Sequence, residues 1–129
     1  MTKHELQQYR WIQKNISRLE ERLLELETEA TRITTHLTKE PKGTSSTDKL
    51  STLVAQIVDT RDEINRQLRE AYSRQMAIEA AIDKLPEREK YLVRARYIDL
   101  KAWEQIAVDM NYSWKHTHRI HARALKMLA

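Results

Sequence analysis

The chain has 129 residues and a net charge of +4, with 33% charged and 40% hydrophobic residues but only one glycine and two prolines. This balance favours long helices, so we expect an all-α protein with a long antiparallel helical hairpin followed by a three-helix helix-turn-helix unit. The absence of cysteine excludes disulfides and thiolate zinc sites, and the lack of a long apolar run predicts no membrane association and a cytoplasmic location in the host cell.

Residues 1–85 are expected to form the hairpin and to mediate oligomerisation. In the first helix, expected over about residues 2–38, apolar side chains alternate at spacings of three and four residues. The members of this heptad seam are Tyr9, Ile12, Ile16, Leu19, Leu23, Leu26, Ala30, Ile33 and Leu37. A seam sustained over this length is typical of a coiled coil. The residues predicted to carry oligomerisation are Ile12, Ile16, Leu19, Leu23, Leu26 and Ile33.

Residues 39–48 contain proline, glycine and a Ser/Thr cluster, which predicts a loop, with Thr47 or Asp48 capping a second helix over about residues 49–84. The apolar face of this helix comprises Leu50, Leu53, Val54, Ile57, Ile64, Leu68, Ala71, Tyr72, Ile78, Ile82 and Leu85. Two helices leave side chains such as Leu24 and Val58 uncovered, so we expect a homodimer or higher oligomer. The alternative is a monomeric hairpin whose open side packs on its own C-terminal unit.

Residues 86–129 are expected to form the helix-turn-helix domain. The three predicted helices cover about residues 86–100, 102–110 and 113–128. The first opens at Pro86, a residue tolerated at a helix start. Asn111 suits the left-handed turn between the second and third helices, and Ser113 is a good N-cap for the third. In such a unit the last helix enters the DNA major groove.

The last predicted helix has two distinct faces. At about 100° per residue, the inward face holds Thr117, Ile120, His121, Ala124 and Leu128. The outward face holds Lys115, His118, Arg119, Ala122 and Lys126. Residues 113–129 carry four cations and no carboxylate, and residues 86–129 contain nine cations against five anions, so the whole net charge lies in this domain. A face of one sign predicts a polyanionic partner, here double-stranded DNA, whereas the alternative is an ordinary solvated helix.

Residues 85–128 contain several short motifs. They are Leu85-Pro86-x-Arg88-Glu89, Arg96-Tyr97, Trp103-Glu104-Gln105-Ile106-Ala107, Ser113 and Ala124-Leu125. In these residues the chain resembles region 4 of the bacterial sigma factors, a domain that reads promoter DNA. The resemblance implies a DNA-binding helix-turn-helix and contact with the β-subunit flap of RNA polymerase. Two positions depart from that family, because a usual turn glycine is replaced around Leu100 and Ala102 stands where a Ser or Thr cap is usual.

The resemblance also implies which residues contact DNA. Base readout is assigned to Trp114, Lys115, His118 and Arg119. Among these, Lys115 and Arg119 are predicted to contact guanine, the commonest target of these side chains. Contacts to the DNA backbone are assigned to Ser113, Arg123, Lys126, Arg96 and Lys101.

The whole chain, including Tyr9-Arg10-Trp11-Ile12 and the Pro41-Lys42-Gly43 loop, further resembles small phage ArpU/RinA-type transcriptional regulators. This resemblance implies control of phage late or packaging genes. Two other functions remain open at this point: a small terminase-type DNA-packaging subunit, which would form a large ring, and a coiled-coil adaptor whose basic tail binds an acidic protein.

No catalytic residue, metal site or cofactor is expected. The chain has no glycine-rich phosphate loop, cysteine nucleophile or serine elbow. His116, His118 and His121 share a helix without an acidic neighbour, which favours groove-facing or packed histidines over a metal site. We hypothesise that protonation of these histidines strengthens DNA binding below neutral pH.

Overall fold

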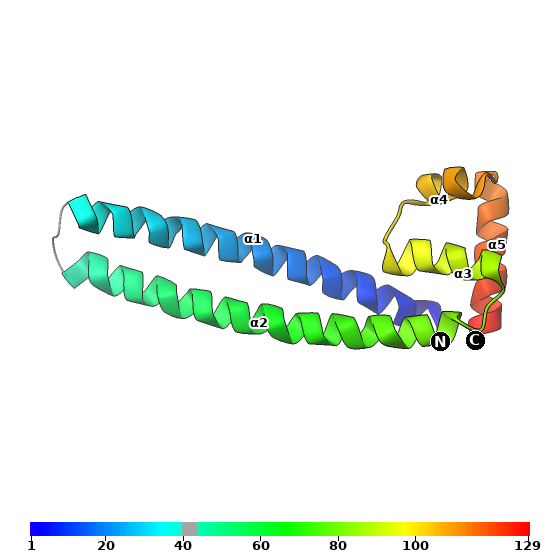
Figure 1. Cartoon of the computed structure of the whole chain (residues 1–129), viewed down its shortest axis with the longest axis horizontal. Coiled ribbons are helices and arrows are strands. Elements are labelled where there is room, and N and C mark those ends of the chain that lie inside the picture. Colours follow the sequence, from blue (N-terminus) through cyan, green and yellow to red (C-terminus); the bar gives the residue numbers. More distant parts are fainter. Residues whose placement is uncertain (40–43) are drawn as a thin grey trace. The chain divides into compact units, whose positions relative to one another are not determined.

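The computed structural model describes residues 1–39 and 44–129, and every regular element in it is helical (Figure 1). In chain order the elements are α1 (Lys3–Lys39), α2 (Thr44–Ile82), α3 (Glu87–Val93), the π-helix η1 (Arg94–Ile98), α4 (Trp103–Met110) and α5 (Trp114–Leu128). The predicted all-α class, a long helix pair followed by a short-helix unit, is therefore confirmed. None of the helices in these two stretches is long and apolar enough to cross a membrane.

Helix α2 begins earlier than the sequence predicted. It starts at Thr44, so Thr47 and Asp48 lie inside the helix and do not cap it, which corrects that prediction. Ser and Thr disfavour a helix interior by less than about 0.7 kcal/mol each, so a short cluster of them does not stop a helix that is stabilised elsewhere. The rest of the predicted loop, residues 40–43, lies outside the described residues.

The contacts divide the chain into two compact units. Unit 1 comprises residues 1–13 and 70–129, and unit 2 comprises residues 14–69. The start of α1 and the end of α2 thus belong to the same unit as the three short helices. The boundary predicted between residues 85 and 86 separates the segment expected to oligomerise from the segment expected to bind DNA, and it stays a prediction.

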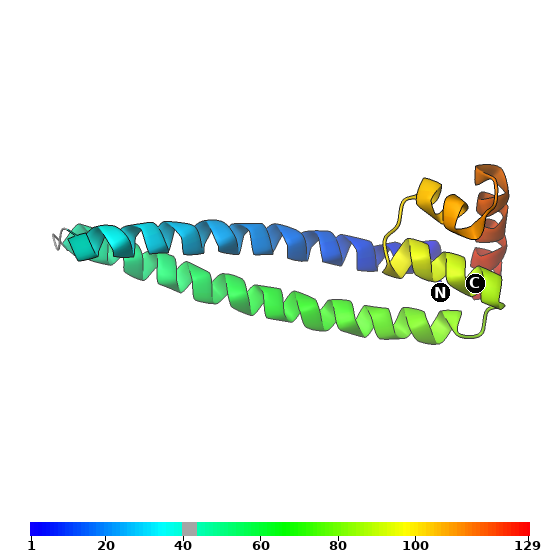
Figure 2. The ribbon, with the colours of Figure 1, turned by 45° about the horizontal axis from the view of Figure 1, so that its top comes forward.

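Unit 2 is an antiparallel pair formed by α1 and α2, which run side by side in both views (Figures 1 and 2). The heptad seam of α1 is its buried face, where Ile16, Leu26 and Ile33 are at most 5% exposed. On α2, Ile57 and Ile64 are also buried. At the edge of the pair, Arg61 donates a hydrogen bond of 2.7 Å to the Glu27 carboxylate. The ion pair is exposed and contributes little, so apolar burial holds the pair together.

The apolar face of α2 is wider than α1 can cover. Val54 and Leu68 were predicted to face inward, but they are 49% and 46% exposed. Tyr72, in unit 1, is 65% exposed and was also predicted to face inward. A single partner helix covers a narrow stripe, so these residues at the margin of the apolar face stay in solvent.

Unit 1 has a core that joins all three short helices. Leu92 and Val93 of α3, Ile106 of α4 and Ala124 of α5 have no exposed surface. The core also includes Leu6, which lies one turn before Tyr9, the first residue of the predicted seam. The sequence prediction missed Leu6. The chain ends meet here, because the Met1 ammonium donates a hydrogen bond of 2.6 Å to the Leu128 carbonyl.

The junctions between the short helices place α4 and α5. Asn111 adopts the left-handed conformation, with φ 61°, and the amides of Asn111 and Tyr112 donate to the carbonyls of Val108 and Ala107. This pair of bonds is a Schellman motif, so the predicted turn at Asn111 is confirmed. Leu100 also has a positive φ of 58°, although a bulky side chain at such a position costs about 1 kcal/mol relative to glycine.

The core of unit 1 predicts a contrast between two positions on α4. Ile106→Ala should lower the free energy of unfolding by about 2–5 kcal/mol, because Ile106 is fully buried and the truncation leaves a cavity. Val108→Ala, on the same helix but 73% exposed, should change it by less than about 0.5 kcal/mol. Urea denaturation followed by circular dichroism measures both, and equal effects would contradict this packing.

Candidate nucleic-acid interface

Helix α5 is capped and oriented as the sequence predicted. The Ser113 hydroxyl oxygen accepts a hydrogen bond of 3.1 Å from the His116 amide. This side-chain cap satisfies one of the free amides of the first turn. The five residues assigned to the inward face, Thr117, Ile120, His121, Ala124 and Leu128, are all buried. The rotation of α5 about its axis is therefore the one predicted.

The charged residues on the solvent face of α5 are all positive. Its four cations, Lys115, Arg119, Arg123 and Lys126, are exposed on a helix without a carboxylate. Within the described part of the chain, none of the four forms an ion pair, whereas cations of α1 and α2 such as Arg32 and Arg74 pair with a glutamate on their own helix. An exposed row of unneutralised cations favours contact with phosphate groups.

Trp114 and His118 begin an aromatic stack that runs from α5 to α4. Trp114 is 57% exposed, and its ring centroid lies 3.9 Å from that of His118. His118 is half-buried, and its ring centroid also lies 4.3 Å from that of Trp103. Its Nε2 atom makes no hydrogen bond with any described residue. The stack leaves Trp114 open to a partner and holds His118 behind it, so base reading by either residue stays a prediction.

A second histidine, His121, is buried beneath this stack. The Tyr97 hydroxyl lies 2.6 Å from its Nε2 atom. Burial, together with the positive charge of nearby Lys3, lowers the His121 pKa to about 4, and burial raises the pKa of Tyr97. Both side chains are therefore neutral at neutral pH, and the imidazole tautomer decides whether the hydroxyl or Nε2–H donates the hydrogen bond.

The proposed role of histidine protonation in DNA binding is not favoured by these environments. Burial and the nearby Arg96 guanidinium lower the pKa of His118, and the pKa of His121 falls to about 4. His121 therefore stays neutral between pH 8 and pH 6, and the shift of the His118 pKa opposes protonation of that imidazole.

Arg96 and Lys101, both assigned to the DNA backbone, have partners within the domain. The Arg96 guanidinium donates to the Lys101 carbonyl at 2.9 Å and lies 4.7 Å from the ring centroid of Trp103. The Lys101 ammonium donates to the Asp109 carboxylate at 3.2 Å. The Arg96 guanidinium has further N–H donors that a ligand could use. The Lys101 ammonium would have to leave the Asp109 carboxylate to contact a phosphate.

Sequence reasoning did not assign a role in the site to Trp103 or Tyr97. Trp103 contacts Arg96, His118 and His121, and Tyr97 contacts His121. The periodicity marks Trp103 as an inward residue of α4 but does not indicate that it joins α5 to the π-helix. The π-helix itself has no sequence signal here, although its extra residue per turn sets the direction of Arg96 and Tyr97.

Comparison with known proteins agrees with the geometry of the short-helix unit. Residues 81–129 match the family model described as Sigma-70, region 4. No match is found among curated proteins or among solved structures. The resemblance predicted from the motifs is thus confirmed for this domain, which is a sigma-region-4-like, DNA-binding helix-turn-helix.

The neutral, buried His121 predicts a specific loss of stability in acid. The His121 pKa is lower in the folded chain than in the unfolded chain, where it is about 6.5, so protonation favours the unfolded chain. The full stability is therefore present above about pH 6.5 and is lost as pH falls towards 4. The free energy of unfolding should fall by roughly 3 kcal/mol over that range on account of this group. His118, whose pKa is also lowered, adds a loss in the same direction.

Urea denaturation at a series of pH values measures this loss. His121→Gln, which keeps an acceptor for Tyr97, should remove most of the slope between pH 6.5 and 4. His4→Gln, at an exposed position of α1, serves as the control and should retain the slope. A slope that survives in His121→Gln would place the responsible group elsewhere.

Proposed function

We propose that this chain is a sequence-specific, DNA-binding transcriptional regulator without enzymatic activity. The observation that carries the proposal is the unpaired, one-sign cationic face of α5 on a sigma-region-4-like helix-turn-helix. In such a unit, base contacts come from the first turns of the last helix, where Lys115 and Arg119 are exposed. Arg123 and Lys126, farther along the same helix, would hold phosphates and set the register.

The finer assignment is a phage-encoded activator of late or packaging genes. It is supported by the resemblance of the whole chain to phage ArpU/RinA-type regulators, and the likeness to sigma region 4 supports contact with RNA polymerase. Transcription from the gene's own flanking DNA with purified host polymerase tests the sign of regulation. An increase on adding the chain supports an activator, and a decrease would contradict it.

Oligomerisation is part of the proposal and rests on unit 2. The predicted seam residues Ile16, Leu26 and Ile33 are already buried within a single chain. Leu24 is 65% exposed, and on α2 Val54, Val58 and Leu68 lie within about 80° of one another, all between 46% and 49% exposed. This apolar surface, defined here as Leu24, Val54, Val58 and Leu68, is available to a second copy of the chain.

Specific DNA binding is tested with duplexes tiled across the DNA that flanks the gene, at about 150 mM salt with competitor DNA. One duplex should bind about 10³-fold or more above the others. Arg119→Ala should then cost about 1–3 kcal/mol on that duplex and relax the preference at one base pair. Arg119→Lys should lose much of the preference as well, because lysine lacks the planar fork that grips guanine.

The matched control for Arg119→Ala is Arg69→Ala, which removes an exposed arginine of α2 with no ion pair among the described residues. Affinity and preference should be unchanged in that variant. An equal loss on all duplexes in Arg119→Ala would make Arg119 a phosphate contact. Uniform weak binding by the wild-type chain that disappears with salt would favour the adaptor.

Oligomerisation is tested by mass in solution. Light scattering should give two to four times the chain mass of 15.4 kDa for the wild type, and Val58→Glu should shift the population to single chains. The charge would have to be buried in the apolar surface, which is costly without a partner. Gln56→Glu, which places the same charge at an exposed polar position of α2, should leave the mass unchanged. A wild-type monomer would contradict the proposal, and eight or more chains would favour a packaging ring.

A further inference from the structure

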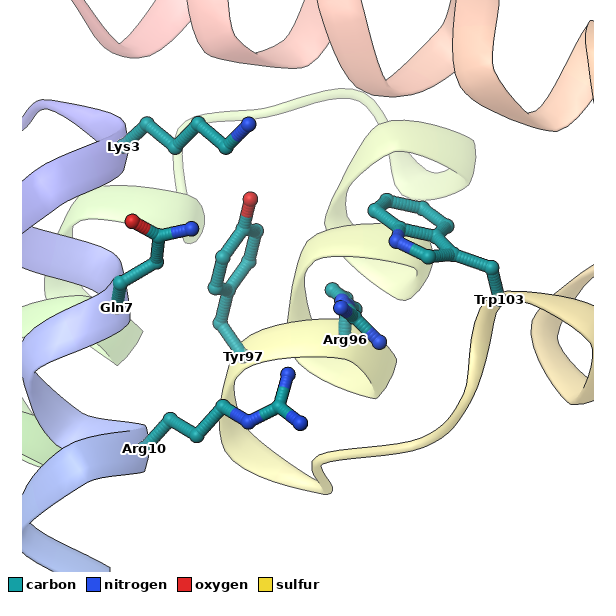
Figure 3. Close-up of a pocket in the computed structure, with 6 residues that line it drawn as sticks. All are labelled: Lys3, Gln7, Arg10, Arg96, Tyr97 and Trp103. Atoms are coloured by element: carbon teal, nitrogen blue, oxygen red, sulfur yellow. The ribbon is translucent and has the colours of Figure 1, made fainter.

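A small basic pocket lies within unit 1 between the start of α1 and the π-helix (Figure 3). Its volume is about 80 Å³. The lining residues are Lys3, Gln7, Arg10, Arg96, Tyr97 and Trp103. The first three come from α1, where a helix places them within about 60° of one another, and they face the other three across the opening.

The pocket gathers positive charge that the chain itself does not neutralise. Its lining includes three cations and no carboxylate. None of the three makes an ion pair with a described residue. Burial and the positive charge of Arg10 lower the pKa of Arg96, and the carboxylate that opposes this shift belongs to the exposed Glu104 of α4. Like charges brought together in a half-buried site repel one another, so an anion in the pocket would relieve the repulsion.

The donors around the pocket suit a phosphate group. Arg10 and Arg96 carry planar forks that match two oxygens, and Lys3 adds a third cation. The Gln7 amide lies beside them as a neutral donor (Figure 3). A volume of about 80 Å³ equals that of roughly two to three water molecules, which admits one tetrahedral oxyanion but not a nucleotide base.

The pocket is contiguous with the proposed DNA-reading surface. Trp103 lines the pocket and also contacts His118, which in turn stacks on Trp114 at the first turn of α5. A duplex bound by α5 therefore has its backbone close to the pocket. Phosphate contacts beside a recognition helix fix its orientation on the duplex.

We propose that the pocket formed by Lys3, Arg10 and Arg96 binds a phosphate group of the DNA backbone, so that the start of α1 is part of the DNA-binding surface. The inference rests on the proposed function for its source of phosphate. It extends that function to a segment far from the helix-turn-helix in sequence. It also gives the remaining donors of the half-buried Arg96 guanidinium a partner.

The first test is the salt dependence of binding to the preferred duplex by the full chain. Each phosphate contact contributes about 0.9 to the slope of log affinity against log salt. Arg10→Gln should lower the slope by about 0.9, so that between about 50 and 200 mM salt its affinity falls roughly threefold less than that of the wild type. Lys3→Gln should act in the same way. Arg10→Lys, which keeps the charge, should restore the slope.

The control is Arg18→Gln, which removes one cation from α1 outside the pocket and should leave the slope unchanged. Thermal melting of each variant shows that it is folded. Equal slopes in the wild type and Arg10→Gln, with an intact melting transition, overturn the assignment to backbone phosphate.

The second test uses inorganic phosphate without DNA. Phosphate stabilises folded proteins generally, so the comparison is between variants: the rise in melting temperature in phosphate over chloride at the same ionic strength should be larger for the wild-type chain than for Arg10→Gln. A phosphate effect with an unchanged DNA slope would assign the pocket to a small phosphate-bearing ligand and overturn the DNA source. If neither phosphate nor the DNA slope responds to Arg10→Gln, the pocket binds no phosphate.

The two tests separate this inference from the proposed function. A wild-type chain that prefers no duplex, but gains phosphate-dependent stability through Arg10, would contradict the regulator and the DNA source while retaining phosphate binding. A chain that prefers one duplex and loses that preference in Arg119→Ala, but shows no effect of Arg10→Gln or phosphate, would retain the regulator and overturn the pocket.

Discussion

Helix α5 packs against α3 and α4 through Ile120 and Ala124, which are 2% and 0% exposed, and this burial sets its rotation about its axis. A helix with one apolar stripe can bury only that stripe, so the opposite face is turned to solvent. In α5 that face holds only cations and neutral residues. The direction in which the domain presents its charge is therefore a consequence of core packing. The left-handed turn at Asn111 places α4 where it completes this core.

Beneath the cationic face, the domain keeps the His121 imidazole neutral. His121 is enclosed by Tyr97 and Trp103, and the cations near it, such as Lys3, oppose its protonation. A neutral imidazole shares a hydrogen bond with tyrosine and packs edge-on against tryptophan without the cost of burying a charge. The same group joins the π-helix, α4 and α5, so it supports the proposed reading surface as a packing element and leaves charge recognition to arginine and lysine.

The two long helices differ in how much of the apolar face of each is covered by the other. The heptad seam of α1 is narrow and is covered by α2, whereas the apolar face of α2 extends beyond what α1 reaches, leaving Val58 49% exposed. Two packed helices enclose little volume, and such pairs commonly gain a further layer from another copy. The exposed residues of unit 2 thus supply a physical reason for the proposed assembly, separate from the DNA-binding chemistry of unit 1.

The helical periodicities by themselves determined the all-α class, the buried seam of α1 and every inward residue of α5, because each depends on contacts a few residues apart. The turn at Asn111 followed from the tolerance of asparagine for the left-handed conformation, and periodicity has limits of its own. The periodicities did not determine the start of α2 or the exposure of Val54, since periodicity identifies an apolar face but not the width that a partner covers. The tertiary structure alone placed Lys3 and Arg10 opposite Arg96. Arg10 and Arg96 are 86 positions apart in the sequence, and only the folding of α1 against the short-helix unit brings them together.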